Sequence, residues 1–322
     1  MHTEFKFHPQ VTQIGCYWGQ GGHTELYLIE GEELVLIDTG CANCPADFVL
    51  PALAELGRSP RDVPVIINTH GHFDHAGGNA DFVAASGAQV WLSAADAPVA
   101  EDLELQFRTY FAQNDTLVGR EDRLAASKDD LYRQTKPTKV DRLLREGEVL
   151  DLGRGVQLRV VATPGHTVGS LSLFWEREGL LFSGDALPGR GSRPGSFPLL
   201  YVPAAYEKTL DTVAGLDARL LCLSHHYRTL SLTTESVKYG EAGKAYVGEC
   251  RQIFRLIARA VRAAVKEHPG APFLEVARAA TRSVAAKTTV DIDPDTGLPR
   301  WGPTATLYAL WQLEHKAESA WR

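Results

Sequence analysis

Histidine and aspartate side chains gather in one short segment of the sequence. His70, His72 and His75 fall within six residues, together with the carboxylate of Asp74. Imidazole nitrogens and carboxylate oxygens are the ligands of zinc and similar divalent metals. A lone histidine is more often an ordinary structural residue, but four ligand-type residues at this spacing do not follow a core pattern. The segment therefore predicts a metal site.

Further ligand-type residues occur at three later points in the chain. They are His166 in TPGH, Asp185 in SGD, and the pair His225 and His226 after Ser224. Five or six histidines and two aspartates exceed the three or four protein ligands of one zinc ion, so two ions are expected.

The elements that position these residues are short, apolar, strand-like runs. The first cluster follows such a run at 63–68, and the later points follow runs at 158–162, 180–183 and 220–223. Open α/β sheets build their sites at strand ends, so the ligand-type residues are expected to meet at one edge. Further strands are predicted at 26–30, 34–38, 89–92 and 171–175, and helices at 45–57 and 81–86.

Two parts of the chain depart from this alternation. Residues 94–139 are rich in charge and predict a helical insertion, either a lid over the site or a solvated excursion. Past residue 230 the strand pattern stops, and helices are predicted at 236–267, 272–286 and 303–320. We therefore expect an α/β catalytic domain over residues 1–230, followed by a helical C-terminal subdomain over 231–322.

Composition limits the class of protein. With 44% hydrophobic and 23% charged residues, the chain is typical of a packed globular protein. Residues 1–227 hold 19 Lys and Arg against 30 Asp and Glu, a net −11, while 228–322 hold 14 against 10, a net +4. The acidic main body argues against a broad nucleic-acid surface. Five cysteines, no membrane-length apolar stretch and no secretory pattern at the start predict a cytoplasmic protein.

Five ordered motifs resemble those of the metallo-β-lactamase superfamily over roughly residues 10–230. They are LIDTG at 36–40, THGHFDHAGG at 69–78, TPGHTVGS at 163–170, FSGD at 182–185 and LSHH at 223–226. The resemblance implies an αβ/βα sandwich, with two mixed sheets face to face, helices outside and the metal site at one edge.

The resemblance also implies a role for each ligand-type residue. One ion is expected at His70, His72 and His166, and the other at Asp74, His75 and either His225 or His226. His225 is favoured because it directly follows Ser224. Asp185 is expected to bridge the two ions, and Asp38 to hold the ligand loop through hydrogen bonds. The expected cofactors are two divalent ions, with zinc first and manganese or iron as alternatives.

The resemblance points to the branch with glyoxalase II-type thioesterases and acyl-homoserine lactonases. Zinc β-lactamases typically carry cysteine at the position of Asp185 or lack the bridging carboxylate, so antibiotic hydrolysis is disfavoured. We expect hydrolysis of a small ester, thioester or lactone by a metal-bridging hydroxide, with Asp74 able to pass a proton to the leaving group. The alternatives are a persulfide dioxygenase with one iron at His70, His166 and Asp185, and a metal-dependent ribonuclease.

The sequence also gives expectations about partners, the pocket wall and two less specific features. A small acyl substrate is expected, with nucleic acid disfavoured, no membrane, and a homodimer left open. Residues 94–139 and the C-terminal helices are expected to wall the pocket. Tyr201 and Tyr206 are candidates to reach the substrate, with packing at a helix start favoured for Tyr206. The pair Cys41 and Cys44 is either incidental or a redox or third metal site. A basic stripe along the long helix is either a solvated face or an anion-attracting surface; it comprises Arg251, Arg255, Arg259, Arg262 and Lys266.

Overall fold

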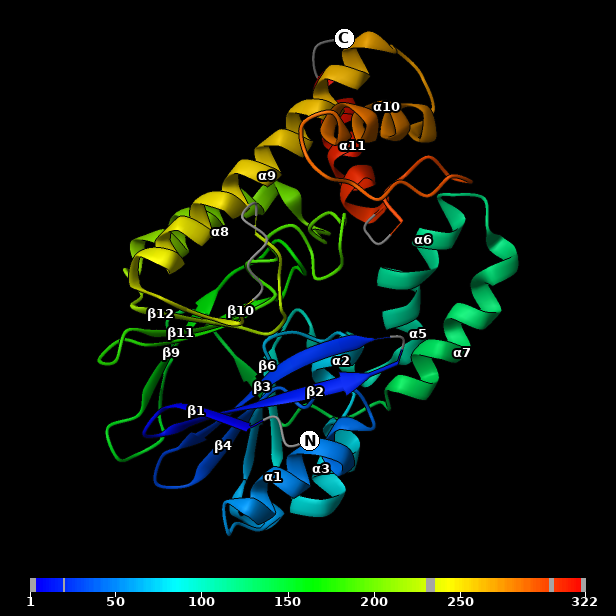
Figure 1. The fold of residues 1–322 in the computed structure, drawn as a ribbon. Helices are drawn as coiled ribbons and strands as arrows, with labels where there is room; N and C mark the ends of the chain where they lie inside the picture. Colours follow the sequence, from blue (N-terminus) through cyan, green and yellow to red (C-terminus); the bar gives the residue numbers. More distant parts are fainter. Residues whose placement is uncertain (1–3, 20, 230–234, 301–303, 320–322) are drawn as a thin grey trace.

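Two β-sheets pack face to face, with helices on the outer side of each (Figure 1). The computed structural model describes residues 4–19, 21–229, 235–300 and 304–319. Over these ranges no helix is both long and apolar enough to cross a bilayer. The arrangement is the predicted αβ/βα sandwich.

The first sheet contains seven strands within the described residues, in sequence order across the sheet. They are β1 (Glu4–His8), β2 (Val11–Trp18), β3 (Gly22–Glu30), β4 (Leu34–Ile37), β5 (Val65–Ile67), β6 (Gln89–Ser93) and β7 (Arg142–Leu144). Strands β1 to β4 pair antiparallel, and β4 to β7 pair parallel.

The second sheet contains six described strands in the order β13-β12-β11-β10-β9-β8. They are β8 (Val149–Asp151), β9 (Gln157–Ala162), β10 (Leu171–Trp175), β11 (Leu180–Gly184), β12 (Leu220–Leu223) and β13 (Val237–Tyr239). Only β11 and β12 pair parallel within these residues.

Helices form the two outer layers and one flank. The outer helices are α1 (Leu50–Glu55), α3 (Asn79–Ser86), α8 (Pro203–Gly215), α9 (Gly240–Glu267), α10 (Phe273–Ala285) and α11 (Thr304–Ser319). The insertion forms α4 (Ala97–Glu101), α5 (Leu103–Gln106), a π-helical turn (Phe107–Phe111), α6 (Ala112–Thr116) and α7 (Leu124–Gln134). Figure 1 shows α8 and α9 over the second sheet and α1 and α3 outside the first.

Strand residues alternate between two apolar cores because successive side chains point to opposite faces of a sheet. On β3, Tyr27 and Ile29 join the core between the sheets, whereas Leu26 and Leu28 pack with α1 and α3. On β11, Leu180 and Phe182 lie in the core between the sheets, while Leu181 packs with α8 and α9. Both faces of each sheet are therefore buried, which explains the nearly continuous apolar runs in the sequence.

The long amphipathic helix matches its prediction except at its start. Its predicted apolar face (Val247, Cys250, Phe254, Ile257 and Val261) is buried against the second sheet and its neighbouring helices. The helix begins at Gly240 rather than at residue 236, because Val237–Tyr239 instead form β13, paired antiparallel with β12. The prediction that strands end before residue 230 is therefore wrong.

Other differences between the predicted and the observed elements occur where the elements are short or irregular. The helix predicted over 45–57 is a π-helical turn, Pro45–Val49, followed by α1. Strands β7 and β8 have three residues each and are largely exposed, so they leave no clear apolar pattern. The predicted domain boundary at residue 230 falls outside the described residues, so the two-domain division stays a prediction.

Candidate metal centre

The seven residues predicted as metal ligands meet at one edge of the sandwich. His70 and His72 lie in the loop after β5, and Asp74 and His75 lie on the following short helix, α2 (Phe73–Ala76). The other three follow strands of the second sheet: His166 after β9, Asp185 after β11 and His225 after β12. Strand ends from both sheets thus supply the cluster, as the sequence predicted.

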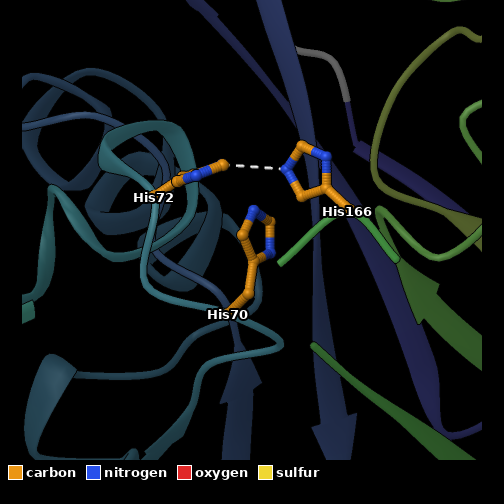
Figure 2. Close-up of side chains that lie close together, drawn as sticks. All are labelled: His70, His72 and His166. Atoms are coloured by element: carbon orange, nitrogen blue, oxygen red, sulfur yellow. Dashed lines mark hydrogen bonds between the residues drawn. The ribbon is translucent and has the colours of Figure 1, made fainter. Parts of the chain in front are cut away.

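The first group consists of His70, His72 and His166, whose rings converge in Figure 2. His166 Nε2 lies 2.8 Å from His72 Nδ1. The ring of His70 lies 4.8 Å from that of His72 and 4.7 Å from that of His166, measured between centroids. Three imidazoles therefore turn toward one point.

The second group consists of Asp74, His75 and His225. His225 Nε2 lies 3.2 Å from His75 Nε2 and 3.4 Å from Asp74 Oδ2. His226 does not belong to this group, because its Nε2 lies 2.9 Å from Glu25 Oε1. Of the two histidines left open by the sequence, the structure therefore places His225 in the cluster.

Asp185 stands between the two groups. Its Oδ2 lies 3.3 Å from His166 Nε2, and its Oδ1 lies 3.4 Å from both His75 Nε2 and His225 Nε2. The preceding Gly184 has φ +50°, and a Cβ there would lie 2.6 Å from the side chain of Thr69. The glycine of the SGD motif thus allows the close approach that brings this carboxylate to both groups.

Hydrogen bonds on the outer ring nitrogens fix the histidine orientations. His166 Nδ1 lies 2.9 Å from the Leu199 carbonyl and His225 Nδ1 2.5 Å from the His23 carbonyl. His75 Nδ1 lies 2.8 Å from Asp38 Oδ2. Because a carbonyl or carboxylate can only accept, each Nδ1 carries a proton, so that Nε2 is the ring nitrogen left to bind a cation when the ring is neutral.

Two inward-facing atoms fit a bound cation better than an empty polar core. His70 Nε2 and Asp185 Oδ1 are buried and have no hydrogen-bond partner within the described part of the chain, while His72 turns its Nδ1 toward His166. Burial lowers the pKa of His70 and His72, which keeps them neutral. Burial alone would raise the pKa of Asp185, but His225, His75 and His166 bring it well below its usual range.

The spacing of the inward atoms also fits metal ions. Ligand atoms about 2.0 to 2.2 Å from a tetrahedral ion stand about 3.3 to 3.5 Å apart. The separations of Asp185 Oδ1 from His75 and His225 and of Asp185 Oδ2 from His166 fall in this range. The His72–His166 and His75–His225 pairs, at 2.8 and 3.2 Å, are closer and would move apart slightly to admit an ion. The donor set of imidazoles and carboxylates suits zinc and similar divalent ions.

Asp38 holds the ligand loop, as predicted. It has φ +60°, a conformation that aspartate tolerates better than most residues. Its Oδ1 accepts from the Thr69 backbone N–H at 2.8 Å, and its Oδ2 accepts from Thr69 Oγ1 and His75 Nδ1, each at 2.8 Å. One buried carboxylate therefore orients the first loop and a histidine of the second group.

Sequence reasoning missed Asp96, which ties two ligand loops together. Its carboxylate accepts from the backbone N–H groups of Gly71 and Gly169, each at 3.0 Å, and from Thr167 Oγ1 at 2.7 Å. Asp96 is fully buried shortly after the end of β6. Its position after a predicted strand was a usable signal, but no neighbouring ligand-type residue marked it.

We expect Asp96→Ala to lower the free energy of unfolding by about 3 kcal/mol, because three buried donors lose their acceptor. The change is measured by urea denaturation of the metal-free protein, so that loss of metal does not contribute. Exposed Asp129→Ala on α7 serves as the control. Equal stability of the two variants would contradict the role assigned to Asp96.

A cavity of about 550 Å³ opens beside the cluster and is lined by Asp74, Asp185 and His225 among others. Phe111 of the insertion and Tyr201 also line it. Tyr110 places its ring 4.4 Å from that of His72. The insertion therefore forms a wall of the cavity, rather than a solvated excursion.

Tyr206 packs near the start of α8 in the outer core, away from the cavity, which is the position the sequence favoured for it. One prediction about the cavity wall is corrected. No described residue beyond Tyr227 lines the cavity, so the C-terminal helices do not wall it. They instead hold the 187–200 segment from behind: Tyr246 donates to the Leu187 carbonyl, and Thr306 Oγ1 accepts from the Leu200 backbone N–H, both at 2.7 Å.

The cysteine pair is consistent with incidental cysteines, and the basic stripe is consistent with a solvated face. Cys41 and Cys44 are free, buried in the core outside the first sheet, and do not line the cavity. On α9, Arg251 and Arg255 pair with Glu207 at 2.9 and 2.7 Å, and Arg262 pairs with Glu314 at 2.9 Å. These ion pairs neutralise much of the stripe.

The chain is similar over about half of its length to two curated proteins named as hydrolases. It is 28% identical over 151 residues to a hydroxyacylglutathione hydrolase of Rhodospirillum rubrum, covering 47% of this chain and 44% of that protein. It is 30% identical over 187 residues to the acyl-coenzyme A thioesterase MBLAC2 of Gallus gallus, covering 54% and 63%. The chain spans about half the length of the hydroxyacylglutathione hydrolases that it matches.

Solved structures share the fold over nearly the whole chain. A metallo-beta-lactamase family protein from Thermus thermophilus superposes with a TM-score of 0.69 at 21% identity, covering 98% of this chain and 95% of that one. A beta-lactamase domain protein from Burkholderia ambifaria gives 0.65 at 18% identity, covering 98% and 88%. The profile of the Metallo-beta-lactamase superfamily matches residues 20–225. The chain therefore belongs to the metallo-beta-lactamase superfamily.

Proposed function

We propose that the protein is a dinuclear metal-dependent hydrolase of a small ester, thioester or lactone. The observation that carries the proposal is the position of Asp185, whose two oxygens face the two groups of ligand-type residues separately. A carboxylate so placed suits two ions that share a ligand. The family and its hydrolase relatives support metal dependence.

The proposed ligands divide between two ions. His70, His72 and His166 would hold one ion, Asp74, His75 and His225 the other, and Asp185 both. Each ion then has four protein ligands, within the coordination number usual for zinc. We propose zinc for both, with manganese or iron as the alternatives.

When bound, two such ions supply a hydroxide at neutral pH and polarise the substrate carbonyl. The chain's own residues hold and orient the reacting groups. Asp74 lines the cavity and carries a side chain that is 14% exposed, so the carboxylate oxygen not used as a ligand could take the proton that the attacking water loses and pass it to the leaving group. His166 and His225 are fixed through backbone carbonyls, which keeps their lone pairs directed inward.

The cavity suits an acyl substrate. Phe111, Phe197 and Leu199 give it an apolar wall, and Arg193 lies on the same lining. An acyl chain can bury apolar surface on that wall while its carbonyl reaches the cluster. The names of the relatives, a hydroxyacylglutathione hydrolase and an acyl-coenzyme A thioesterase, favour a thioester over the other two classes.

Two other functions make different demands on this site. A persulfide dioxygenase would use one iron at His70, His166 and Asp185, leaving the second group without a role. A metal-dependent ribonuclease needs a basic surface for the phosphate backbone, whereas the main body is acidic and much of the α9 stripe is ion-paired. The charge distribution favours the hydrolase over the ribonuclease, and metal identity decides between the hydrolase and the dioxygenase.

The test is metal content together with a substrate panel. Protein purified without chelator and dialysed against metal-free buffer is expected to retain two zinc ions per chain by elemental analysis. It is expected to hydrolyse acylglutathione or acyl-coenzyme A thioesters faster than lactones or esters. One iron per chain with oxygen uptake on glutathione persulfide, or cleavage of RNA without thioesterase activity, would overturn the proposal.

A further inference from the structure

We propose that His23, Glu25 and His226 form a third metal site, which takes a divalent ion of the zinc type beside the proposed dinuclear centre. His23 and Glu25 lie on β3, and His226 follows His225 after β12. None of the three belongs to the seven residues of the central cluster. The inference does not rest on the proposed hydrolase activity.

The three ligand atoms are already gathered around one point. Glu25 Oε1 lies 2.9 Å from His226 Nε2 and 3.3 Å from His23 Nε2. The two imidazole rings lie side by side, with centroids 4.1 Å apart and planes tilted by 36°. Atoms bound to a tetrahedral ion stand about 3.3 to 3.5 Å apart, so small side-chain shifts suffice to admit the ion.

The backbone fixes these positions. His23 and Glu25 are two residues apart on one strand, so their side chains share a face of the sheet. The Glu25 backbone N–H donates to the Ser224 carbonyl at 2.7 Å, and His225 Nδ1 donates to the His23 carbonyl at 2.5 Å. The loop that carries His226 is therefore pinned to the strand that carries the other two ligands.

Charge balance at Glu25 favours a cation. The residue is 5% exposed, and no Lys or Arg pairs with it among the described residues. Another partner is the Ser236 hydroxyl, which donates to Oε1 at 3.4 Å. A buried carboxylate is costly unless a positive charge joins it, and a divalent ion supplies that charge.

His23 has a second unsatisfied feature. Its Nδ1 is buried without a hydrogen-bond partner in the described part of the chain, while its Nε2 faces Glu25. Its Nε2, 3.3 Å from Glu25 Oε1, is the ring atom placed to act as a ligand.

Open coordination positions at the site face two cavities. His23 and His226 line the cavity of the central cluster and also a second cavity of about 510 Å³ on the other side. Two imidazoles and one carboxylate leave at least one position for water or for a polar group of a bound molecule. An ion held by three ligands with an accessible face should bind more weakly than the central pair.

The test counts weakly bound zinc. Protein that retains its tightly bound ions after dialysis is titrated with zinc chloride, and uptake is followed by equilibrium dialysis and elemental analysis. The wild type is expected to take up one more ion per chain than Glu25→Gln. His226→Ala is expected to lose the same ion. Because the His226 side chain is half-exposed, this variant provides the test if Glu25→Gln fails to fold.

The matched control is His268→Ala, which removes the histidine of a surface His–Glu pair with Glu275. Its zinc uptake is expected to equal that of the wild type. Equal uptake by the wild type and both site variants would overturn the proposal. Tightly and weakly bound ions are counted separately. A wild type with fewer than two tightly bound ions would therefore refute the dinuclear centre, and the uptake of the weakly bound ion would still test the third site.

Discussion

Replacing Asp185 by asparagine is expected to lower kcat/KM for the preferred acyl substrate by about a thousandfold or more while the protein stays folded. The two carboxylate oxygens face different groups of ligands, at 3.3 Å from His166 and 3.4 Å from His75 and His225. An asparagine keeps the shape but has one oxygen and no charge. It can serve one ion at most, so the second should be lost or held weakly.

The effect is measured as two numbers on one preparation, zinc per chain after dialysis and kcat/KM in the thioester assay. We expect fewer than two tight ions and the large loss of activity together. Asp129→Asn removes the same charge from the exposed side of α7 and should change neither number. An Asp185→Asn protein with two tight ions and more than a tenth of wild-type activity would refute the bridging role.

The fold and the cluster were predictable because each ligand-type residue follows a strand with a strong apolar signal. β10 and β12 match their predicted bounds, since both faces of these strands are buried and the runs are unbroken. The chemistry of His70, His72 and His75 on one short segment then specified a metal. Local sequence thus contained these strands and the residues at their ends, while the sandwich arrangement was implied by the family resemblance.

The parts that escaped prediction depend on contacts between distant segments. Asp96 is recognisable only through its bonds to Gly71 and Gly169, which lie 25 and 73 residues away. His23 and Glu25 meet His226 across about 200 residues, as neighbouring strand ends bring them together. The sequence of β13 shows no strong strand pattern, and the strand forms because it pairs with the free edge of β12. Sequence patterns report burial along one element, whereas these features arise from pairing between elements.

Asp38→Asn is expected to weaken binding of the ion at His75 by about 10- to 100-fold with only a modest loss of stability. The reason is the proton on His75. Asp38 Oδ2 accepts from His75 Nδ1, which leaves Nε2 as a lone pair directed at Asp185 and His225. If the asparagine oxygen stays with the Thr69 backbone N–H, its amide nitrogen faces His75 and donates to Nδ1. The ring proton then moves to Nε2, where it blocks the metal.

The opposite amide orientation leads to a different loss. It would place two N–H donors face to face at Thr69, leaving a buried donor unsatisfied at a cost of about 1 to 3 kcal/mol. Competition with a zinc chelator measures the affinity, and urea denaturation of the metal-free protein measures the stability. Asp38→Ala, which removes every acceptor at once, should lower the free energy of unfolding by about 3 to 5 kcal/mol. Wild-type zinc affinity in Asp38→Asn would show that the carboxylate does not set the tautomer of His75, and that its role is confined to holding the loop.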